Sequence, residues 1–288
     1  MVPRKAYTVP IAGGRRLQLG ERTLVMAIVN ITPDSFADRA PSTDPARALD
    51  LAHAAADQGA DLLDLGAEST RPGSGTLPEE EERRRLLPAL RAIASRVPLP
   101  ISVDTRKAAV ARVALDEGAS IVNDISGLGY DSELGAVVAA AGAGLILMHM
   151  RGTPEDMYRE ARYRDVAGEV THELRGAIER ALAAGVSREA LILDPGIGFA
   201  KQAGHSFEAL ARLPALGVLD RPLLVGPSRK SFLQAALGDC PPSARDWGTA
   251  ASVAAAILEG AHIVRVHAVR EMVQVARVSD AIRRHAGV

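Results

Sequence analysis

The sequence predicts an α/β fold, a single (β/α)8 barrel. Eight short apolar runs alternate with helical patterns along nearly the whole chain. The runs are continuous rather than alternating, as expected for parallel strands that are covered on both faces. Strand–helix units repeated in series are typical of such a barrel. We expect strands at 24–30, 61–66, 100–104, 119–123, 144–149, 190–194, 221–226 and 261–266.

Helical patterns fill the intervals between the expected strands. In the run at 79–93, acidic residues precede arginines by three and four positions, which supports a solvated helix face. An open doubly wound sheet is the alternative, but a dinucleotide-binding sheet would carry a GxGxxG motif after its first strand, and this sequence has none there. We expect helices near 44–58, 78–96, 106–117, 132–142, 165–185, 206–212, 246–259 and 270–285.

The domain organisation follows from length and composition. The chain has 288 residues, a length that α/β barrels reach as one domain. No shift in composition marks a second domain. We therefore expect one barrel domain at 24–288, preceded by a small cap or hairpin at 1–23 on the bottom of the barrel.

Charge and cysteine content exclude several classes of protein. The formal net charge is −1, which argues against a protein that binds nucleic acid or a membrane surface through bulk charge. The single cysteine excludes an internal disulfide and a cysteine-based metal cage. The first residues lack a secretory signal, and no apolar run is long enough to span a bilayer. We expect a cytoplasmic protein with no nucleic-acid or membrane partner.

Polar residues stand where the expected strands end, and in a barrel these ends open on the one face that carries the chemistry. Asp104, Asn123 and Asp194 end three of the strands. Carboxylate and amide groups suit a ligand with several N–H donors, such as a pterin or purine ring. Helix capping explains any one of them equally well, but three on one face favour a binding site.

A second group at the same face is cationic. The loops after the seventh and eighth strands are the usual phosphate site of such barrels. Lys230 and Ser231 are expected to open a helix after the seventh strand, whose N-terminus offers free backbone N–H groups. A phosphate, a diphosphate or a carboxylate would fit here. For one arginine alone, a surface ion pair is the commoner fate. The group comprises Thr70, Arg71, Lys230, Ser231, Arg265 and His267.

Asn30, at the end of the first strand, is a candidate ligand for Mg²⁺. Its amide oxygen suits this hard cation, which uses few protein groups together with substrate phosphates. The alternative is a turn residue ahead of Thr32 and Pro33, and the sequence alone favours that alternative.

Several motifs together resemble the dihydropteroate synthase family of folate biosynthesis. They are MAIVNITPDSF, DLGAESTRPG, SVDTRK, IVNDISG, LMHMRGTP, LDPGIGFAK, LLVGPSRKSF and IVRVH, in the family's order. The resemblance implies a (β/α)8 barrel that forms a homodimer and uses Mg²⁺. The implied reaction condenses 6-hydroxymethyl-7,8-dihydropterin diphosphate with 4-aminobenzoate, giving 7,8-dihydropteroate and diphosphate. Sulfonamides, which mimic 4-aminobenzoate, are expected inhibitors.

The resemblance also implies a role for each matching residue. The pterin would be bound by Asp104, Asn123, Asp194 and Lys230. The diphosphate would be bound by Asn30, Arg71, Arg265 and His267, with Asn30 also on the metal. The aminobenzoate would contact Thr70, Arg71, Pro72, Phe199 and Ser231, and loop 1 would contribute Phe36 and Asp38. Catalysis would depend on Asp104, Lys230, Arg265 and His267.

Two lesser candidates lie near the pterin side. Lys201 is one of only four lysines among the 34 basic residues, so we expect a role near the pterin, with an exposed loop lysine as the alternative. His149 ends a strand, where a satisfied buried histidine is as consistent as a functional one.

Two positions depart from the family pattern and keep other functions open. Ala268 stands where the family usually has Asp, and Arg39 and Ala40 replace glycines of loop 1, so diphosphate handling and loop closure are expected to differ. These departures are the only hints of a non-catalytic pterin-binding paralogue. A methyltransferase barrel that presents methyltetrahydrofolate to a corrinoid would share the acidic pocket, but it has no need of the SRKS and STRP motifs.

Overall fold

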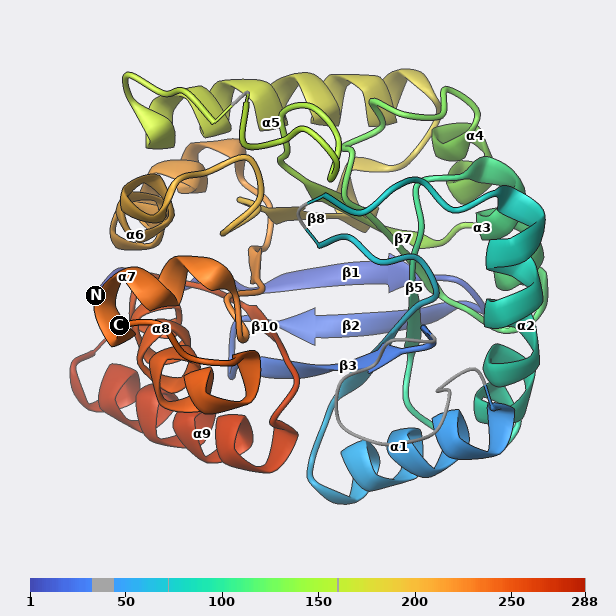
Figure 1. The fold of residues 1–288 in the computed structure, drawn as a ribbon, viewed down its shortest axis with the longest axis horizontal. Coiled ribbons are helices and arrows are strands. Elements are labelled where there is room, and N and C mark those ends of the chain that lie inside the picture. The colour runs from blue at the N-terminus through green and yellow to red at the C-terminus, as the bar shows by residue number, and fades with distance from the viewer. Residues whose placement is uncertain (33–43, 72, 160, 288) are drawn as a thin grey trace.

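The computed structural model describes residues 1–32, 44–71, 73–159 and 161–287. It shows parallel strands surrounded by helices (Figure 1). The prediction of a (β/α)8 barrel is confirmed. The barrel strands are β3 (Leu24–Asn30), β4 (Leu62–Gly66), β5 (Ile101–Asp104), β6 (Ile121–Asp124), β7 (Gly144–Met148), β8 (Leu191–Asp194), β9 (Leu224–Val225) and β10 (Ile263–Val266).

The eight strands follow one another around the sheet in the order β8-β7-β6-β5-β4-β3-β10-β9, and every pair is parallel. A single bridge between Leu193 and Leu223 brings β8 to the start of β9. The backbone N–H of Leu193 also donates to the carbonyl of Pro222 at 2.9 Å. These contacts nearly close the barrel. The strand expected at 221–226 is regular only over Leu224–Val225, because its first residues contribute this bridge and irregular hydrogen bonds instead.

Helices cover the outside of the barrel. In the described part of the chain, no helix is long and apolar enough to cross a membrane. The main ones are α1 (Pro45–Asp57), α2 (Glu79–Ala94), α3 (Ala108–Asp116), α4 (Leu134–Ala140), α5 (Val166–Ala183), α6 (Ala203–Ala211), α8 (Asp246–Leu258) and α9 (Val269–His285), with one short helix, α7 (Gln234–Leu237).

The expected helices agree with these bounds apart from a few residues at their ends. Short 3₁₀ segments that the sequence did not indicate lie at Arg188–Ala190, Leu213–Leu219, Ser231–Leu233 and Pro242–Arg245.

An antiparallel hairpin, β1 (Tyr7–Ile11) and β2 (Arg15–Leu19), covers one end of the barrel. In Figure 1 its two strands cross the middle of the molecule. Its apolar face packs on the inner residues near the amino ends of the strands, so this end is sealed by an aliphatic layer and the opposite end carries the polar side chains. The layer consists of Val9, Ile11, Leu17, Leu19, Leu24, Met26, Leu62, Ile121, Ile146, Ile192, Leu224 and Ile263.

Met26 lies in this layer and is fully buried. We expect Met26→Ala to lower the free energy of unfolding by about 2–5 kcal/mol, because it removes buried methylene contacts and leaves a cavity. Urea unfolding followed by circular dichroism measures this. The matched control is Val218→Ala at a side chain that is 70% exposed, for which we expect a change within about 0.5 kcal/mol. Equal losses in the two variants would contradict the assignment of Met26 to the sealed layer.

Candidate functional site

The sheet register places three of the predicted site residues, Asn30, Asp104 and Asn123, in one row, with Gly66 between the first two. Asn30 is paired with Gly66, Gly66 with Asp104, and Asp104 with Asn123, across four neighbouring strands. Each of these residues lies at or next to the carboxyl end of its strand. Parallel strands in register therefore bring an amide, a carboxylate and a second amide to the same end of the barrel.

Arg265 on β10 links the acidic side chains of this end. Its Nε donates to Oδ2 of Asp64 at 2.6 Å, and its Nη2 donates to Oδ2 of Asp104 at 3.0 Å. Nδ2 of Asn123 donates to the same oxygen of Asp64 at 3.1 Å. One guanidinium thus connects two carboxylates that approach it from β4 and β5.

Asp64 is a site residue that the sequence analysis missed. It is 0% exposed and lies inside the barrel on β4, below the residues that end the neighbouring strands. The signal was present, because the run DLLDLG places an acid in the middle of an otherwise apolar strand. A buried carboxylate needs a partner, and the guanidinium of Arg265 supplies the positive charge that pairs with Asp64.

The buried acids of this end resist ionisation. Burial raises the pKa of Asp104 to about 7, although the charge of Arg265 opposes the shift. Burial likewise raises the pKa of Asp194 at the end of β8, against the opposing charge of Lys230. The backbone N–H of Gly196 donates to Oδ1 of Asp194 at 2.7 Å and holds this side chain in place.

Lys230 faces the loop that follows β8. Its Nζ donates to the carbonyl of Ile197 and lies 4.0 Å from the centroid of the Phe199 ring. Burial lowers its pKa to about 7, opposed by the nearby Asp194. Gly198 has φ +78°, and a Cβ there would lie 2.8 Å from Cδ of Lys230, so this close approach requires a glycine.

His267 is held at the cationic side of the site. Its Nδ1 lies 2.9 Å from Oγ of Ser228, and its backbone N–H donates to the same oxygen at 3.2 Å. Burial lowers the pKa of His267 to about 3, helped by the charges of Arg229, Arg265 and Arg71. The imidazole is therefore neutral at pH 7, and surrounding positive charge makes this corner receptive to an anion.

The loop after β4, which carries Thr70 and Arg71, is fastened to the barrel by an ionic cluster. Oε1 of Glu68 accepts from Nη2 of Arg106 at 3.0 Å, and Oε2 accepts from Lys107. Lys107 also donates to Glu82, a fully buried acid on α2. Thr70 is partly buried and Arg71 is exposed at the rim of the site.

Three loops meet near Ser231. The backbone N–H of Gly73 donates to the carbonyl of Pro154 at 2.9 Å, and the hydroxyls of Tyr158 and Ser231 lie 3.3 Å apart. The helix expected to begin at Lys230 is instead a 3₁₀ turn over Ser231–Leu233, followed by the single turn of α7. This part of the chain therefore offers a short turn where a helix N-terminus was expected.

The remaining candidates divide into those that the structure describes and those that it does not. Pro72, Phe36 and Asp38, with Arg39 and Ala40, lie outside the described residues. Asn30 is partly buried at the end of β3. Within the described ranges, no group of three or more His, Cys, Asp or Glu side chains could hold a metal ion. The side-chain amide oxygen of Asn30 is of the type that can ligate Mg²⁺, a cation that usually keeps several waters and binds substrate phosphates.

Comparison with known proteins agrees with this arrangement. Residues 26–267 match the family model described as pterin binding enzyme. A dihydropteroate synthase from Synechocystis sp. is 45% identical over 96% of each chain. The crystal structure of Yersinia pestis dihydropteroate synthase with a sulfonamide drug complex superposes with a TM-score of 0.90 at 40% identity, covering 95% of this chain and 98% of that one.

A second solved structure is similar to the same degree. Xanthomonas albilineans dihydropteroate synthase with 4-aminobenzoic acid gives a TM-score of 0.88 at 37% identity, covering 96% of this chain and 98% of the other. The chain belongs to the family of pterin-binding enzymes, and within it to the dihydropteroate synthases. The resemblance read from the sequence motifs is confirmed.

The raised pKa of Asp104 predicts a pH-dependent stability. In the folded protein this acid keeps its proton up to about pH 7, whereas in the unfolded chain it loses it near pH 4. Between these values the folded state binds more protons, so the stabilising contribution is complete below pH 4 and is lost as the pH rises through 7. Asp104→Asn removes this dependence, and its stability relative to the unchanged protein should increase by about 1.4 kcal/mol for each pH unit between pH 5 and pH 7 and then level off.

Urea unfolding of both proteins at pH 5 and pH 8 measures this difference. Asp116→Asn is the matched control, since Asp116 is an exposed acid on α3 and its substitution should change the stability equally at pH 5 and pH 8. A constant difference for Asp104→Asn as well would mean that Asp104 is ionised throughout.

Proposed function

We propose that this chain condenses 6-hydroxymethyl-7,8-dihydropterin diphosphate with 4-aminobenzoate to give 7,8-dihydropteroate and diphosphate. The observation that carries the proposal is the buried cluster of Asp64, Asp104 and Asn123 around Arg265, next to the cationic corner at His267. Relatives of at least 37% identity that carry the name of this enzyme support the same reaction.

The acidic part of the site would bind the pterin. Asp104 and Asp194 can accept hydrogen bonds from the N–H edge of the ring. Among the described side chains, Oδ1 of Asn123 and Oδ1 of Asp64 are buried without a hydrogen-bond partner. Buried polar atoms are normally paired, so the unpaired oxygen of Asn123 supports a ligand with a donor in this position. Lys230 would donate to an acceptor of the ring.

The cationic part would bind the diphosphate and stabilise its departure. Arg265, His267 and Arg71 would offer N–H groups to oxygens that gain charge as the carbon–oxygen bond breaks. The methylene carbon would then carry positive charge, which the neighbouring carboxylates stabilise. The amine of 4-aminobenzoate would attack this carbon and release a proton. In this scheme the protein supplies no nucleophile.

The third part would bind 4-aminobenzoate. Phe199 would contact the ring, while Thr70, Arg71 and Ser231 lie on the loops that surround its position. Pro72 is proposed for the same site. In similar proteins, the Xanthomonas albilineans structure has 4-aminobenzoic acid bound and the Yersinia pestis structure has a sulfonamide drug complex. Sulfonamides are therefore proposed as inhibitors of this chain.

Mg²⁺ is proposed as the cofactor, with Asn30 as its protein ligand. The metal would neutralise charge on the diphosphate. Arg265 and His267 are the residues of this chain that would hold the oxygens of the same group.

The proposed reaction is tested by supplying the dihydropterin diphosphate and Mg²⁺, with and without 4-aminobenzoate, and following dihydropteroate by chromatography. Product that depends on both substrates is expected. Pterin binding without diphosphate release would instead favour a non-catalytic paralogue. Pterin binding with transfer of a methyl group to a corrinoid would favour the methyltransferase alternative.

Lys230 provides the sharpest substitution. We expect Lys230→Met to lower kcat/KM for the dihydropterin diphosphate by about 100-fold, because a charged donor next to Asp194 and Phe199 is lost. Lys5→Met is the matched control. Lys5, near the amino end of the chain, donates a hydrogen bond to Asp220 away from the site, so the steady-state kinetics of this variant should be unchanged. Unaltered kinetics in Lys230→Met would exclude Lys230 from pterin binding.

The metal proposal makes a separate prediction. Chelation of Mg²⁺ should lower the rate at least tenfold, and Asn30→Ala should raise the Mg²⁺ concentration needed for half-maximal rate by about tenfold, because one inner ligand is lost. Titration of the rate with MgCl₂ measures both effects. An unchanged Mg²⁺ requirement in Asn30→Ala would contradict the assignment of Asn30 as a metal ligand and favour the alternative that it is a turn residue.

A homodimer and a cytoplasmic location complete the proposal. The neighbouring helices α8 and α9 expose Trp247 and Val278, which are 87% and 61% exposed. These apolar side chains support association of two copies. Light scattering on the purified protein measures the mass, and a monomer at micromolar concentration would argue against the dimer.

A further inference from the structure

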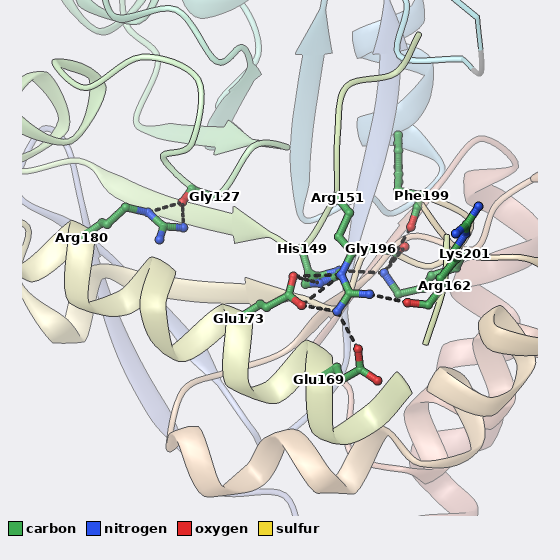
Figure 2. A network of polar contacts seen from close by, with 10 residues as sticks. All are labelled: Gly127, His149, Arg151, Arg162, Glu169, Glu173, Arg180, Gly196, Phe199 and Lys201. Atoms are coloured by element: carbon green, nitrogen blue, oxygen red, sulfur yellow. Dashed lines mark hydrogen bonds and ion pairs between the residues drawn. The ribbon is translucent and has the colours of Figure 1, made fainter. Parts of the chain in front are cut away.

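A buried lysine, Lys201, lies beside the site without entering it. It is 1% exposed, although lysine is among the residues that are least often fully buried. Its Nζ lies 2.9 Å from Nδ1 of His149 and donates to the carbonyls of Gly196 and Phe199, each at 3.2 Å (Figure 2). The alternative of an exposed loop lysine is therefore wrong.

The three partners match the three protons of an ammonium group. Two of them are carbonyl oxygens, which can only accept, and the third is a ring nitrogen that can accept when the histidine is neutral. Burial lowers the pKa of Lys201 to about 7, opposed by the charge of Asp194, and burial also lowers the pKa of His149 to about 4. A charged Lys201 donating to a neutral His149 satisfies every group. Because all three protons are used, Lys201 has none left for a substrate.

His149 in turn is held from its other side. With Nδ1 as an acceptor, the ring proton lies on Nε2 and is donated to Oε2 of Glu173 at 3.0 Å. Burial opposes the ionisation of Glu173, but the hydrogen bonds from His149 and Arg151 hold its pKa at about 2. Arg151 also donates to Glu169 at 2.7 Å, and its guanidinium lies 4.1 Å from the ring centroid of Tyr163. Figure 2 shows this series of polar contacts, which extends from α5 to the loop after β8.

The two carbonyls that Lys201 holds belong to the loop that shapes the site. The backbone N–H of Gly196 donates to Asp194, and the carbonyl of Ile197, between the two held residues, accepts from Lys230. Phe199 itself lies 4.0 Å from Nζ of Lys230. Lys201 thus fixes residues 196–199 through the carbonyls of Gly196 and Phe199. The same segment contacts the site residues Asp194 and Lys230. Without the ammonium, the carbonyl of Phe199 would lose this donor, whereas the carbonyl of Gly196 would still accept from the backbone N–H of Phe199 at 3.0 Å.

We propose that Lys201, acting through His149 and Glu173, is a positioning residue that fixes residues 196–199 and so places the Phe199 ring for 4-aminobenzoate. The role rests on the proposed function. The effect is expected to fall more on 4-aminobenzoate than on the pterin, because Asp104, Asn123 and Arg265 are held by a different network that does not include Lys201. Of the proposed pterin-binding residues, only Asp194 and Lys230 contact the loop, at Gly196, Ile197 and the Phe199 ring.

The first test measures structure without any substrate. The chain has four phenylalanines, Phe36, Phe199, Phe207 and Phe232, so fluorophenylalanine labelling gives four ¹⁹F resonances, which single Phe→Leu variants assign. In Lys201→Met we expect the Phe199 resonance to shift or broaden. The Phe207 and Phe232 rings, which pack on each other at 5.1 Å, should keep their resonances. Lys5→Met is the matched control and should leave all four unchanged.

The second test is kinetic. In Lys201→Met we expect KM for 4-aminobenzoate to rise about tenfold, while KM for the dihydropterin diphosphate changes less than threefold. Lys201→Gln keeps two N–H donors for the carbonyls and should recover part of the loss. An unmoved Phe199 resonance, or equal changes in the two KM values, would overturn the proposal.

The outcomes separate this role from the proposed reaction. If the unchanged enzyme forms no dihydropteroate, the proposed function fails, yet the ¹⁹F comparison still decides whether Lys201 positions the loop. If neither Lys201→Met nor Lys201→Gln folds, as judged by circular dichroism, the positioning role is overturned, because Lys201 would then support the whole barrel.

Discussion

The site depends on one partly buried cation, the guanidinium of Arg265. Ionised carboxylates are costly in a protein interior unless they are paired and hydrogen-bonded. Arg265 reaches Asp64 with one nitrogen and Asp104 with another, and Asp64 in turn accepts from Asn123. Removal of this group would leave two acids facing each other inside the barrel. The planar fork of arginine makes this double contact possible, and a lysine could not reproduce it.

Two kinds of support hold the remaining groups. Asp104, Asn123 and Asp194 stand on strand ends, where the register of the sheet fixes them. Loops carry the others and need their own anchors. Glu68 fastens the loop after β4 to Arg106 and Lys107, and Lys201 fastens the loop after β8 to His149. Both anchors place a buried charge beneath a loop that borders the proposed site, which limits how far the loop can move.

Two ionisable groups of the site have pKa values close to neutral pH. Burial raises the pKa of Asp104 to about 7 and lowers that of Lys230 to about 7. Each group can therefore change its protonation when a charged ligand enters, at small cost in free energy. Such groups titrate as a set rather than one by one. A substrate that carries hydrogen-bond donors at one end and a diphosphate at the other would stabilise the ionised acids together with the charged cations.

The sequence alone determined the barrel, because eight apolar strand runs and their helices are local patterns with a strong period. It also determined which strand ends are polar, and the motif order fixed the family. The sequence analysis did not identify Asp64 as a site residue. It also missed the 3₁₀ segments between residues 213 and 245, where long-range packing rather than a local sequence pattern decides the backbone conformation. Only the tertiary structure joined Arg265 to Asp64 and Asp104, which precede it in the chain by 201 and 161 positions. It likewise decided that Lys201 is buried. The physical reason is that the partners of a buried charge are set by neighbours in space, and closing the barrel brings together strands that are distant in the chain.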